Sequence, residues 1–156
     1  MQNQEIDQSP LDPGDWEEYR TQAHRLLDAC VDHLQSSRER PWHPVPDDIK
    51  ERLRLDDVAS SHALPEVADA LLSDILPFST GNTHPRFFGW VHGTGLPIGV
   101  LADLVASTMN SNCGGRDHVA VYVERAVIDW CKRAFGFPDE ASGGLVTGTS
   151  QATVVA

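Results

Sequence analysis

The end of the chain holds the residue pattern with the clearest chemical meaning. Residues 145–147 predict a short strand, Gly148, Thr149 and Ser150 a tight polar turn, and the residues after them a helix. Backbone N–H groups in the first turn of a helix have no acceptor within the helix, and the helix dipole adds partial positive charge there. Gly148 leaves room for a ligand beside the backbone, and the two hydroxyl groups add hydrogen bonds. The pattern therefore predicts an anion site, with a phosphate group as a suitable ligand.

The same turn also has a purely structural interpretation. Thr and Ser are preferred as helix N-caps, so Thr149 and Ser150 can serve the helix alone. The turn is not a P-loop, because the Gly-Lys-Ser/Thr ending of that motif is absent. Both interpretations of the turn stay open on the pattern alone.

An aromatic loop, HPRFFGWVHG, lies in the middle of the chain. His84 and His92 are eight residues apart with no carboxylate or cysteine near them, which argues against a metal site. The aromatic residues alternate in part, so some are expected to be buried while others line a cavity. They are Phe87, Phe88 and Trp90.

Three further polar residues lie on a long helical pattern near the C-terminus. Asp117 and His118 are either a general-base pair or a capping aspartate beside an incidental histidine. Glu124 is flanked by apolar residues, so a buried carboxylate there needs a hydrogen-bonded partner. We expect Glu124 to be a structural tie.

The composition of the chain excludes several classes of partner. The chain has 156 residues, 40% of them hydrophobic and 22% charged, which is typical of one globular domain. A net charge of −11 disfavours nucleic acid and anionic lipid as partners. No apolar run is long enough to span a membrane. An odd number of cysteines (Cys30, Cys113 and Cys131), without metal-ligand spacing or a secretory signal, indicates reduced thiols and a cytoplasmic location.

The first half of the chain predicts helices and one proline-rich connector. Residues 1–11 are expected to be a flexible arm. Asp12 is expected to cap a long amphipathic helix whose first turn contains Pro13, with an apolar stripe from Trp16 to Leu34. The stretch RERPWHPVPDD predicts an extended connector. Two shorter helices are expected after it, over residues 47–53 and 65–76.

The second half predicts two more helices before the polar turn. A short extended piece is expected over residues 87–91, and helices over 97–110 and 117–135. Gly136 is placed to end the last of these helices in the left-handed conformation. The apolar stripe of the first helix must be covered, either by the rest of the chain or by another subunit.

Taken in order, three segments resemble the pyridoxal-phosphate-dependent group II amino-acid decarboxylases, of the aromatic-L-amino-acid decarboxylase type. They are THPRFFGWVHGTGLPIGVLADLVASTMN, GGRDHVAVYVERAVIDWCKRAFGFP and GGLVTGTSQATVVA, and the resemblance covers residues 12–156. The most specific parts are His-Pro-x-Phe-Phe, Leu-Ala-Asp, the Val-Glu-Arg helix ending in Gly-Phe-Pro, and Gly-Thr-Ser before Ala-Thr.

The resemblance implies an α/β fold of the type I aminotransferase kind, with a seven-stranded, mainly parallel sheet. This chain would hold the mostly helical N-terminal segment of that fold and the first strand of the large domain. Residues 12–78 would be a helical dimerisation segment of an obligate homodimer. Residues 79–156 would begin the large domain that binds the cofactor.

The resemblance also implies roles for individual residues. Gly148, Thr149 and Ser150 would hold the phosphate group of pyridoxal 5'-phosphate. The substrate amino acid would be contacted by the aromatic loop, through Trp90, Val91, His92 and Gly93. No metal site and no catalytic residue is expected within this chain.

Two departures from the family pattern weaken the case for an aromatic substrate. The animal aromatic decarboxylases have a Tyr-Phe-Pro-Thr run at 90–93, and Gly93 lacks the hydroxyl group of that threonine. Asn110, Ser111 and Asn112 are expected near the neighbouring subunit's pocket, and Asn112 stands where those enzymes carry an aromatic residue. A decarboxylase of the glutamate, cysteine sulfinate or diaminobutyrate type stays open.

The positions of the two lysines determine whether the chain alone is expected to be active. Lys50 and Lys132 are the only lysines, and neither matches the family's cofactor lysine. We therefore expect an N-terminal fragment of a decarboxylase that ends abruptly at Ala156, is inactive by itself, and aggregates or remains partly unfolded. The alternative is a non-catalytic interaction module whose helices pair with a full-length subunit.

Overall fold

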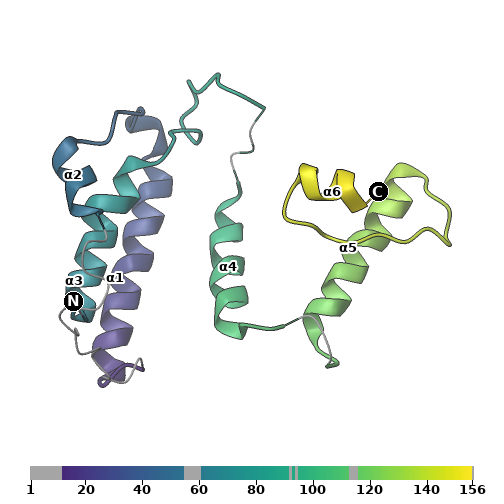
Figure 1. The fold of residues 1–156 in the computed structure, drawn as a ribbon, viewed down its shortest axis with the longest axis horizontal. Helices are drawn as coiled ribbons and strands as arrows, with labels where there is room; N and C mark the ends of the chain where they lie inside the picture. Colours follow the sequence, from purple (N-terminus) through teal and green to yellow (C-terminus); the bar gives the residue numbers. More distant parts are fainter. Residues whose placement is uncertain (1–11, 55–60, 92, 94, 113–115, 156) are drawn as a thin grey trace, which may run out of the picture. The chain divides into compact units, whose positions relative to one another are not determined.

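The computed structural model describes residues 12–54, 61–91, 93, 95–112 and 116–155. The predicted arm 1–11, His92 and Cys113 lie outside these residues. The chain divides into two compact units, residues 1–97 and 98–156, each of which is described by itself (Figure 1). All the regular secondary structure of the described residues is helical. The sheet of the predicted α/β fold is therefore not represented in the described part of the chain.

The first unit is built on the long helix α1 (Trp16–Gln35), which begins later than predicted. Asp15 is its N-cap, and the Asp15 carboxylate accepts hydrogen bonds from the backbone N–H of Glu17 (2.8 Å) and Glu18 (3.2 Å). The prediction that Asp12 caps this helix was wrong. A helix begun at Pro13 would include Gly14 in its first turn, and glycine is unfavourable inside a helix.

The connector after α1 lacks regular structure over most of its length, as the prolines predict. A single turn of 3₁₀-helix, η1 (Ser37–Glu39), overlaps its first two residues, and α2 (Asp47–Arg52) begins at its last two. The predicted helix over 47–53 is confirmed to within one residue.

The predicted helix over 65–76 is present as three consecutive pieces. They are α3 (Leu64–Ala70), the π-helical turn η2 (Leu71–Ile75) and the 3₁₀ turn η3 (Leu76–Phe78). In the π-helical turn the N–H of Leu76 bonds the carbonyl of Leu71, five residues back. This turn therefore holds one residue more than an α-helical turn.

One arginine joins the short helix α2 to the π-helical turn. The Arg52 guanidinium donates to both carboxylate oxygens of Asp74 at 3.0 Å and to Asp48 at 2.9 Å. Asp74 is buried, with 8% of its surface exposed. Hydrogen bonds from Arg52, and then from Ser73, hold the pKa of Asp74 below its usual value.

The loop after η3 folds back on itself, so the predicted extended piece over 87–91 is wrong. Trp90 has a left-handed backbone, with φ of 53°. Its ring meets the Phe87 ring edge to face, with centroids 5.8 Å apart. A non-glycine residue in this conformation breaks a strand, and the ring contact accompanies the bend.

The second unit contains the helices α4 (Pro97–Met109), α5 (Val119–Phe135) and α6 (Thr149–Val155). Gly136 ends α5 with φ of 70° and donates its N–H to the Lys132 carbonyl, which confirms the predicted left-handed cap. Asp117 does not cap this helix; His118 is at the N-cap and makes no side-chain capping bond. Residues 145–147, predicted to be a strand, have no strand partner among the described residues.

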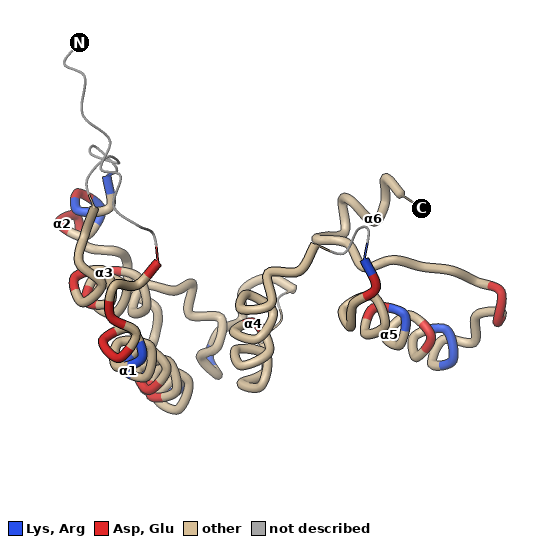
Figure 2. The backbone as a smooth tube through the Cα atoms, turned by 90° about the horizontal axis from the view of Figure 1, so that it is seen from below, with Lys and Arg blue, Asp and Glu red and all other residues tan. Residues whose placement is uncertain are grey.

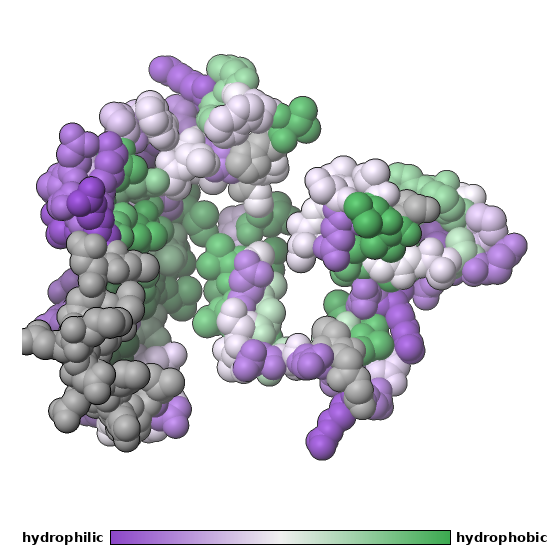
Figure 3. Space-filling view, in the orientation of Figure 1, coloured by the Kyte–Doolittle hydropathy of each residue, from purple (hydrophilic) through white to green (hydrophobic). Residues whose placement is uncertain are grey.

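The described residues form little hydrophobic core. Their buried apolar residues are Ile49 and Ala68, both in the first unit. Apolar side chains lie exposed on the second unit, and Leu104 on α4 is 56% exposed (Figure 3). Charged residues follow α1 and α5 (Figure 2). Among the described residues, no helix combines the length and apolar character needed to cross a bilayer.

Candidate functional site

The predicted phosphate turn lies at the start of α6, where the sequence places it. Gly148 precedes the helix, and its carbonyl accepts the first helical hydrogen bond, from the N–H of Ala152 at 3.0 Å. No hydrogen bond among the described residues has the amide of Gly148, Thr149 or Ser150 as its donor. All three residues are exposed. The turn thus offers unpaired amides and two hydroxyl groups to solvent.

The space beside Gly148 is compatible with a bound phosphate group. A Cβ atom at this position would meet no atom within 4 Å. Packing within the described part of the chain therefore does not require a glycine here. An incoming anion does benefit from its absence of a side chain, because the anion can then approach the backbone closely.

Side-chain oxygens hold the segment that leads into this turn. Glu124 on α5 accepts a hydrogen bond from the Leu145 N–H at 2.9 Å. Gln151 accepts from both the N–H (3.2 Å) and the hydroxyl group (2.8 Å) of Thr147. The prediction that Glu124 is a structural tie is confirmed. The role of Gln151 was missed, although a Gln in the third position of a helix that reaches back to the preceding chain is a known capping pattern.

The predicted substrate loop belongs to the first unit and the phosphate turn to the second. Trp90 is 78% exposed and Val91 fully so, and the Gly93 carbonyl accepts a hydrogen bond from the Asn82 amide at 3.2 Å. The assignment of substrate contacts to Trp90, Val91, His92 and Gly93 stays a prediction.

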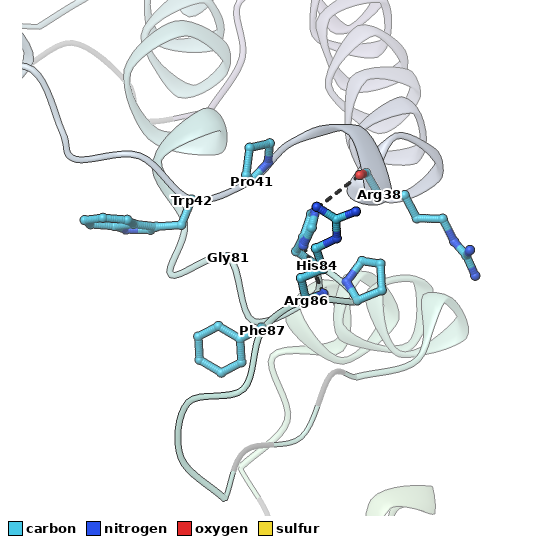
Figure 4. A pocket seen from close by; sticks show the side chains of 8 residues that line it. Arg38, Pro41, Trp42, Gly81, His84, Arg86 and Phe87 are labelled. Carbon is cyan, nitrogen blue, oxygen red and sulfur yellow. Dashed lines mark hydrogen bonds between the residues drawn. The ribbon is translucent and has the colours of Figure 1, made fainter.

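A cavity of about 570 Å³ lies between the connector, at Pro41 and Trp42, and the loop from Gly81 to Phe87 (Figure 4). His84 closes one side of it. Its Nε2 bonds the Arg38 carbonyl at 3.1 Å, and its Nδ1 accepts from the Arg86 N–H at 3.1 Å. This pairing requires a neutral imidazole with its proton on Nε2.

Close backbone approach fixes the other side of the cavity. Gly81 has φ of 70°, and a Cβ there would lie 2.8 Å from the Trp42 Cβ. Only glycine fits this position without strain. From the sequence, His84 was considered only as a metal ligand, and its hydrogen bonds between connector and loop were not predicted. Nothing in the local sequence marks the Arg38 carbonyl, 46 residues away, as its partner.

The residues weighed for general-base chemistry are not paired in the structure. The Asp117 carboxylate accepts a hydrogen bond from the Tyr122 hydroxyl at 2.6 Å. Both ring nitrogens of His118 are buried and have no hydrogen-bond partner among the described residues. The geometry thus gives Asp117 a structural bond within its helix start and no bond to His118.

Both lysines have partners close to them in the sequence. Lys132 donates to the Asp139 carbonyl at 2.7 Å and to Asp129 at 3.3 Å. Lys50 pairs with Asp47 at 2.8 Å. No group of three His, Cys, Asp or Glu side chains in the described ranges could hold a metal ion.

Similar sequences are found among amino-acid decarboxylases. The chain is 29% identical over 149 residues to an aromatic-L-amino-acid decarboxylase of Bacillus atrophaeus, covering 90% of this chain and 30% of that protein. It is 25% identical over 151 residues to tyrosine decarboxylase 1 of Narcissus pseudonarcissus, covering 91% of this chain and 29% of that protein. No protein-family model matches the chain. The chain thus spans about 30% of the length of these relatives.

Solved structures show the same fold over a similar share of their length. The Oryza sativa TDC structure with PLP and tryptamine matches with a TM-score of 0.65 at 20% identity, over 86% of this chain and 30% of that one. The Rhodiola rosea 4-hydroxyphenylacetaldehyde synthase matches with a TM-score of 0.63 at 19% identity, over 81% of this chain and 28% of that one. The helical arrangement is therefore that of part of a larger fold, which accounts for its small core.

Proposed function

We propose that this chain, which is homologous to the N-terminal part of aromatic-L-amino-acid and tyrosine decarboxylases, supplies the phosphate-binding turn and the dimer helices of a pyridoxal-phosphate-dependent amino-acid decarboxylase. The observation that carries the proposal is the turn at the start of α6. It presents unpaired amides, open space beside Gly148, and two hydroxyl groups.

Thr149 and Ser150 would hold the phosphate group of the cofactor through backbone N–H and hydroxyl donors, with Gly148 leaving room for the oxygens. When bound, pyridoxal phosphate supplies the electron-accepting ring that lets an amino acid lose carbon dioxide. The reactive lysine has no counterpart in this chain, since Lys50 and Lys132 both serve local structure. The chain contributes binding and positioning rather than proton transfer.

The exposed aromatic loop would contribute to the substrate pocket of the complete enzyme. Trp90 and Val91 present large apolar surfaces, and exposed aromatic groups of this kind are typical of ligand-binding sites. The relatives named above favour an aromatic amino acid. Gly93 and Asn112 keep a glutamate, cysteine sulfinate or diaminobutyrate type of substrate in consideration.

The dimer helices are proposed from exposed apolar surface on α1. Trp16 and Tyr19 are exposed side by side on that helix, with ring centroids 5.6 Å apart. A second subunit of the complete enzyme would cover them, as the family resemblance implies. The same surface supports the second candidate function, a non-catalytic module that pairs with a full-length subunit. A cytoplasmic location rests on the cysteines alone.

Titration with pyridoxine 5'-phosphate, followed by NMR of the amide groups, tests the phosphate turn. This ligand lacks the aldehyde, so it cannot react with Lys50 or Lys132. We expect shifts at Thr149 and Ser150. Thr149→Pro should weaken binding because it removes one amide donor at a position where proline suits a helix. Thr153→Ala is the matched control, since the Thr153 hydroxyl bonds only the Thr149 carbonyl of its own helix. Shifts that avoid the turn would refute the proposal.

An activity assay tests whether the chain alone is inactive, as both candidate functions require. With pyridoxal phosphate added, we expect no release of carbon dioxide by this chain from any of the candidate amino acids. Turnover would overturn the assignment of the chain as an inactive part. Size-exclusion chromatography with a full-length homologue then tests the interaction module, which predicts a mixed complex.

A further inference from the structure

The segment before the phosphate turn is held through alternate backbone amides. Leu145 and Thr147 are two residues apart, and alternate amides of an extended chain point to the same edge. Both amides meet a side-chain oxygen, that of Glu124 at 2.9 Å and that of Gln151 at 3.2 Å. One acceptor comes from the helix before the segment and the other from the helix after it.

Gly143 lets the segment lie close against α5, and Gly144 lies beside it at an ordinary contact distance from the same helix. A Cβ at Gly143 would lie 3.3 Å from the side chain of Ile128, which is tighter than an ordinary contact. A Cβ at Gly144 would lie 4.0 Å from Glu124 Oε1. Glu124 and Ile128 are four residues apart, so they share one face of α5. Residues 143–145 therefore lie against that face of α5.

We propose that Glu124 and Gln151 are positioning residues, which fix the path of residues 145–147 and so set the geometry of the turn at Gly148, Thr149 and Ser150. This inference rests on the proposed phosphate-binding function of that turn. The role assigned to both side chains is to accept backbone hydrogen bonds. The bond to Leu145 sets where the segment leaves α5, and the bonds to Thr147 set how the segment enters α6.

Two variants at position 124 separate the effect of the hydrogen-bond acceptor of Glu124 from the effect of its charge. A glutamine at 124 keeps a carbonyl oxygen at the same reach but removes the negative charge. An alanine removes both. If position alone matters, Glu124→Gln should behave like the parent chain, and its phosphate affinity should be equal or higher because a nearby negative charge opposes anion binding.

Amide hydrogen exchange measured by NMR on the 156-residue chain tests the two anchors directly. We expect Glu124→Ala to speed exchange of the Leu145 amide about tenfold, and Gln151→Ala to do the same for Thr147. Glu124→Gln and Gln151→Glu should restore the parent rates. Glu140→Ala, an exposed glutamate of the same unit, is the control. Unchanged exchange in the alanine variants, or equal loss in Glu124→Gln and Glu124→Ala, would overturn the proposal.

Binding of inorganic phosphate and pyridoxine 5'-phosphate to the same variants tests the consequence. We expect the dissociation constants to rise several-fold in the two alanine variants and to return in Glu124→Gln. Gln151→Glu keeps the hydrogen-bond acceptor but adds a negative charge beside the turn, so its rescue is measured by amide exchange alone. Suppose that exchange responds as expected but the parent chain binds neither ligand. The proposed phosphate function is then wrong, while Glu124 and Gln151 still fix the path of residues 145–147. If the parent chain binds but the alanine variants bind equally well, the positioning role fails. Should an alanine variant lose helix content by circular dichroism, the Glu124→Gln and Gln151→Glu results decide the outcome.

Discussion

The Asp74 carboxylate is buried and has three hydrogen bonds. Arg52 donates to both of its oxygens and the Ser73 hydroxyl to one. A buried carboxylate is tolerated only with such partners, and it joins the π-helical turn to α2 through Arg52. At the scale of single residues, this contact links two separate elements of the first unit.

The first prediction concerns the pH dependence of that contact. The pKa of Asp74 is lowered in the folded chain, mainly by Arg52 and then by Ser73. Its contribution to stability is therefore present above the unfolded pKa of about 3.9 and is lost as the pH falls through the lower, folded value. Asp74→Asn should be less stable than the parent chain at pH 7, and the difference should shrink toward pH 3.

Urea unfolding of both chains at the two pH values measures this effect. Asp28→Asn on the exposed side of α1 is the control and should show little difference at either pH. A stability gap between Asp74→Asn and the parent chain that stays constant with pH would contradict the role assigned to the carboxylate.

At the scale of secondary structure, the start of α1 depends on one capping residue. The second prediction is that Asp15→Ala costs about 1 kcal/mol of stability, because two first-turn amides lose their acceptor. Asp12→Ala is the matched control and should have almost no effect. Thermal unfolding followed by circular dichroism compares the two, and an equal loss would mean that Asp12 caps the helix after all.

Helix periodicity and glycine placement allowed most elements to be predicted. The helices over α2, α4 and α5 were predicted to within a few residues, as was the left-handed cap at Gly136. Periodicity reports the side of a helix that is apolar, and this signal needs no knowledge of the partner surface.

The errors arose where contacts between side chains decide the local structure. Trp90 leaves the extended conformation in a loop that folds back onto Phe87. The π-helical turn places Asp74 toward Arg52, 22 residues away. The partnership of Asp74 with Arg52 cannot be read from local spacing. Residues 145–147 have a strand pattern, but a strand exists only where a second strand pairs with it.

The residues of the candidate site were also predicted only in part. The position of the turn at Gly148 and the tie at Glu124 were predictable, since both follow from residue type beside a helix. The hydrogen bond from His84 to the Arg38 carbonyl and the one from the Thr147 amide to Gln151 were not predicted. The acceptor of His84 lies in another element.

At the scale of the whole molecule, exposed apolar side chains dominate the second unit. Leu104 and Val105 on α4 are each more than half exposed, and so is Trp130 on α5. Exposed apolar surface on this scale is typical of faces that another part of a protein covers. The relatives are about three times as long, so the rest of such a protein would cover these faces.

The third prediction follows from that surface. The chain alone should self-associate, and Leu104→Lys should weaken the association about tenfold or more, because burial of a leucine side chain contributes about 1.5–3 kcal/mol. Sedimentation velocity at several concentrations measures it. Ser107→Lys adds the same charge at an exposed polar position of α4 and should change association less. Equal effects would show that charge, not the apolar face, governs association.

The extra residue in the π-helical turn has an evolutionary consequence. An α-helix rotates about 100° per residue, and the π-helical turn uses one more residue for nearly the same rotation. Deleting one residue between Leu71 and Ser73 would therefore leave an unbroken α-helix whose two halves keep their directions, with Asp74 still facing Arg52. Natural relatives of this chain that are one residue shorter at this point should therefore keep both Arg52 and Asp74.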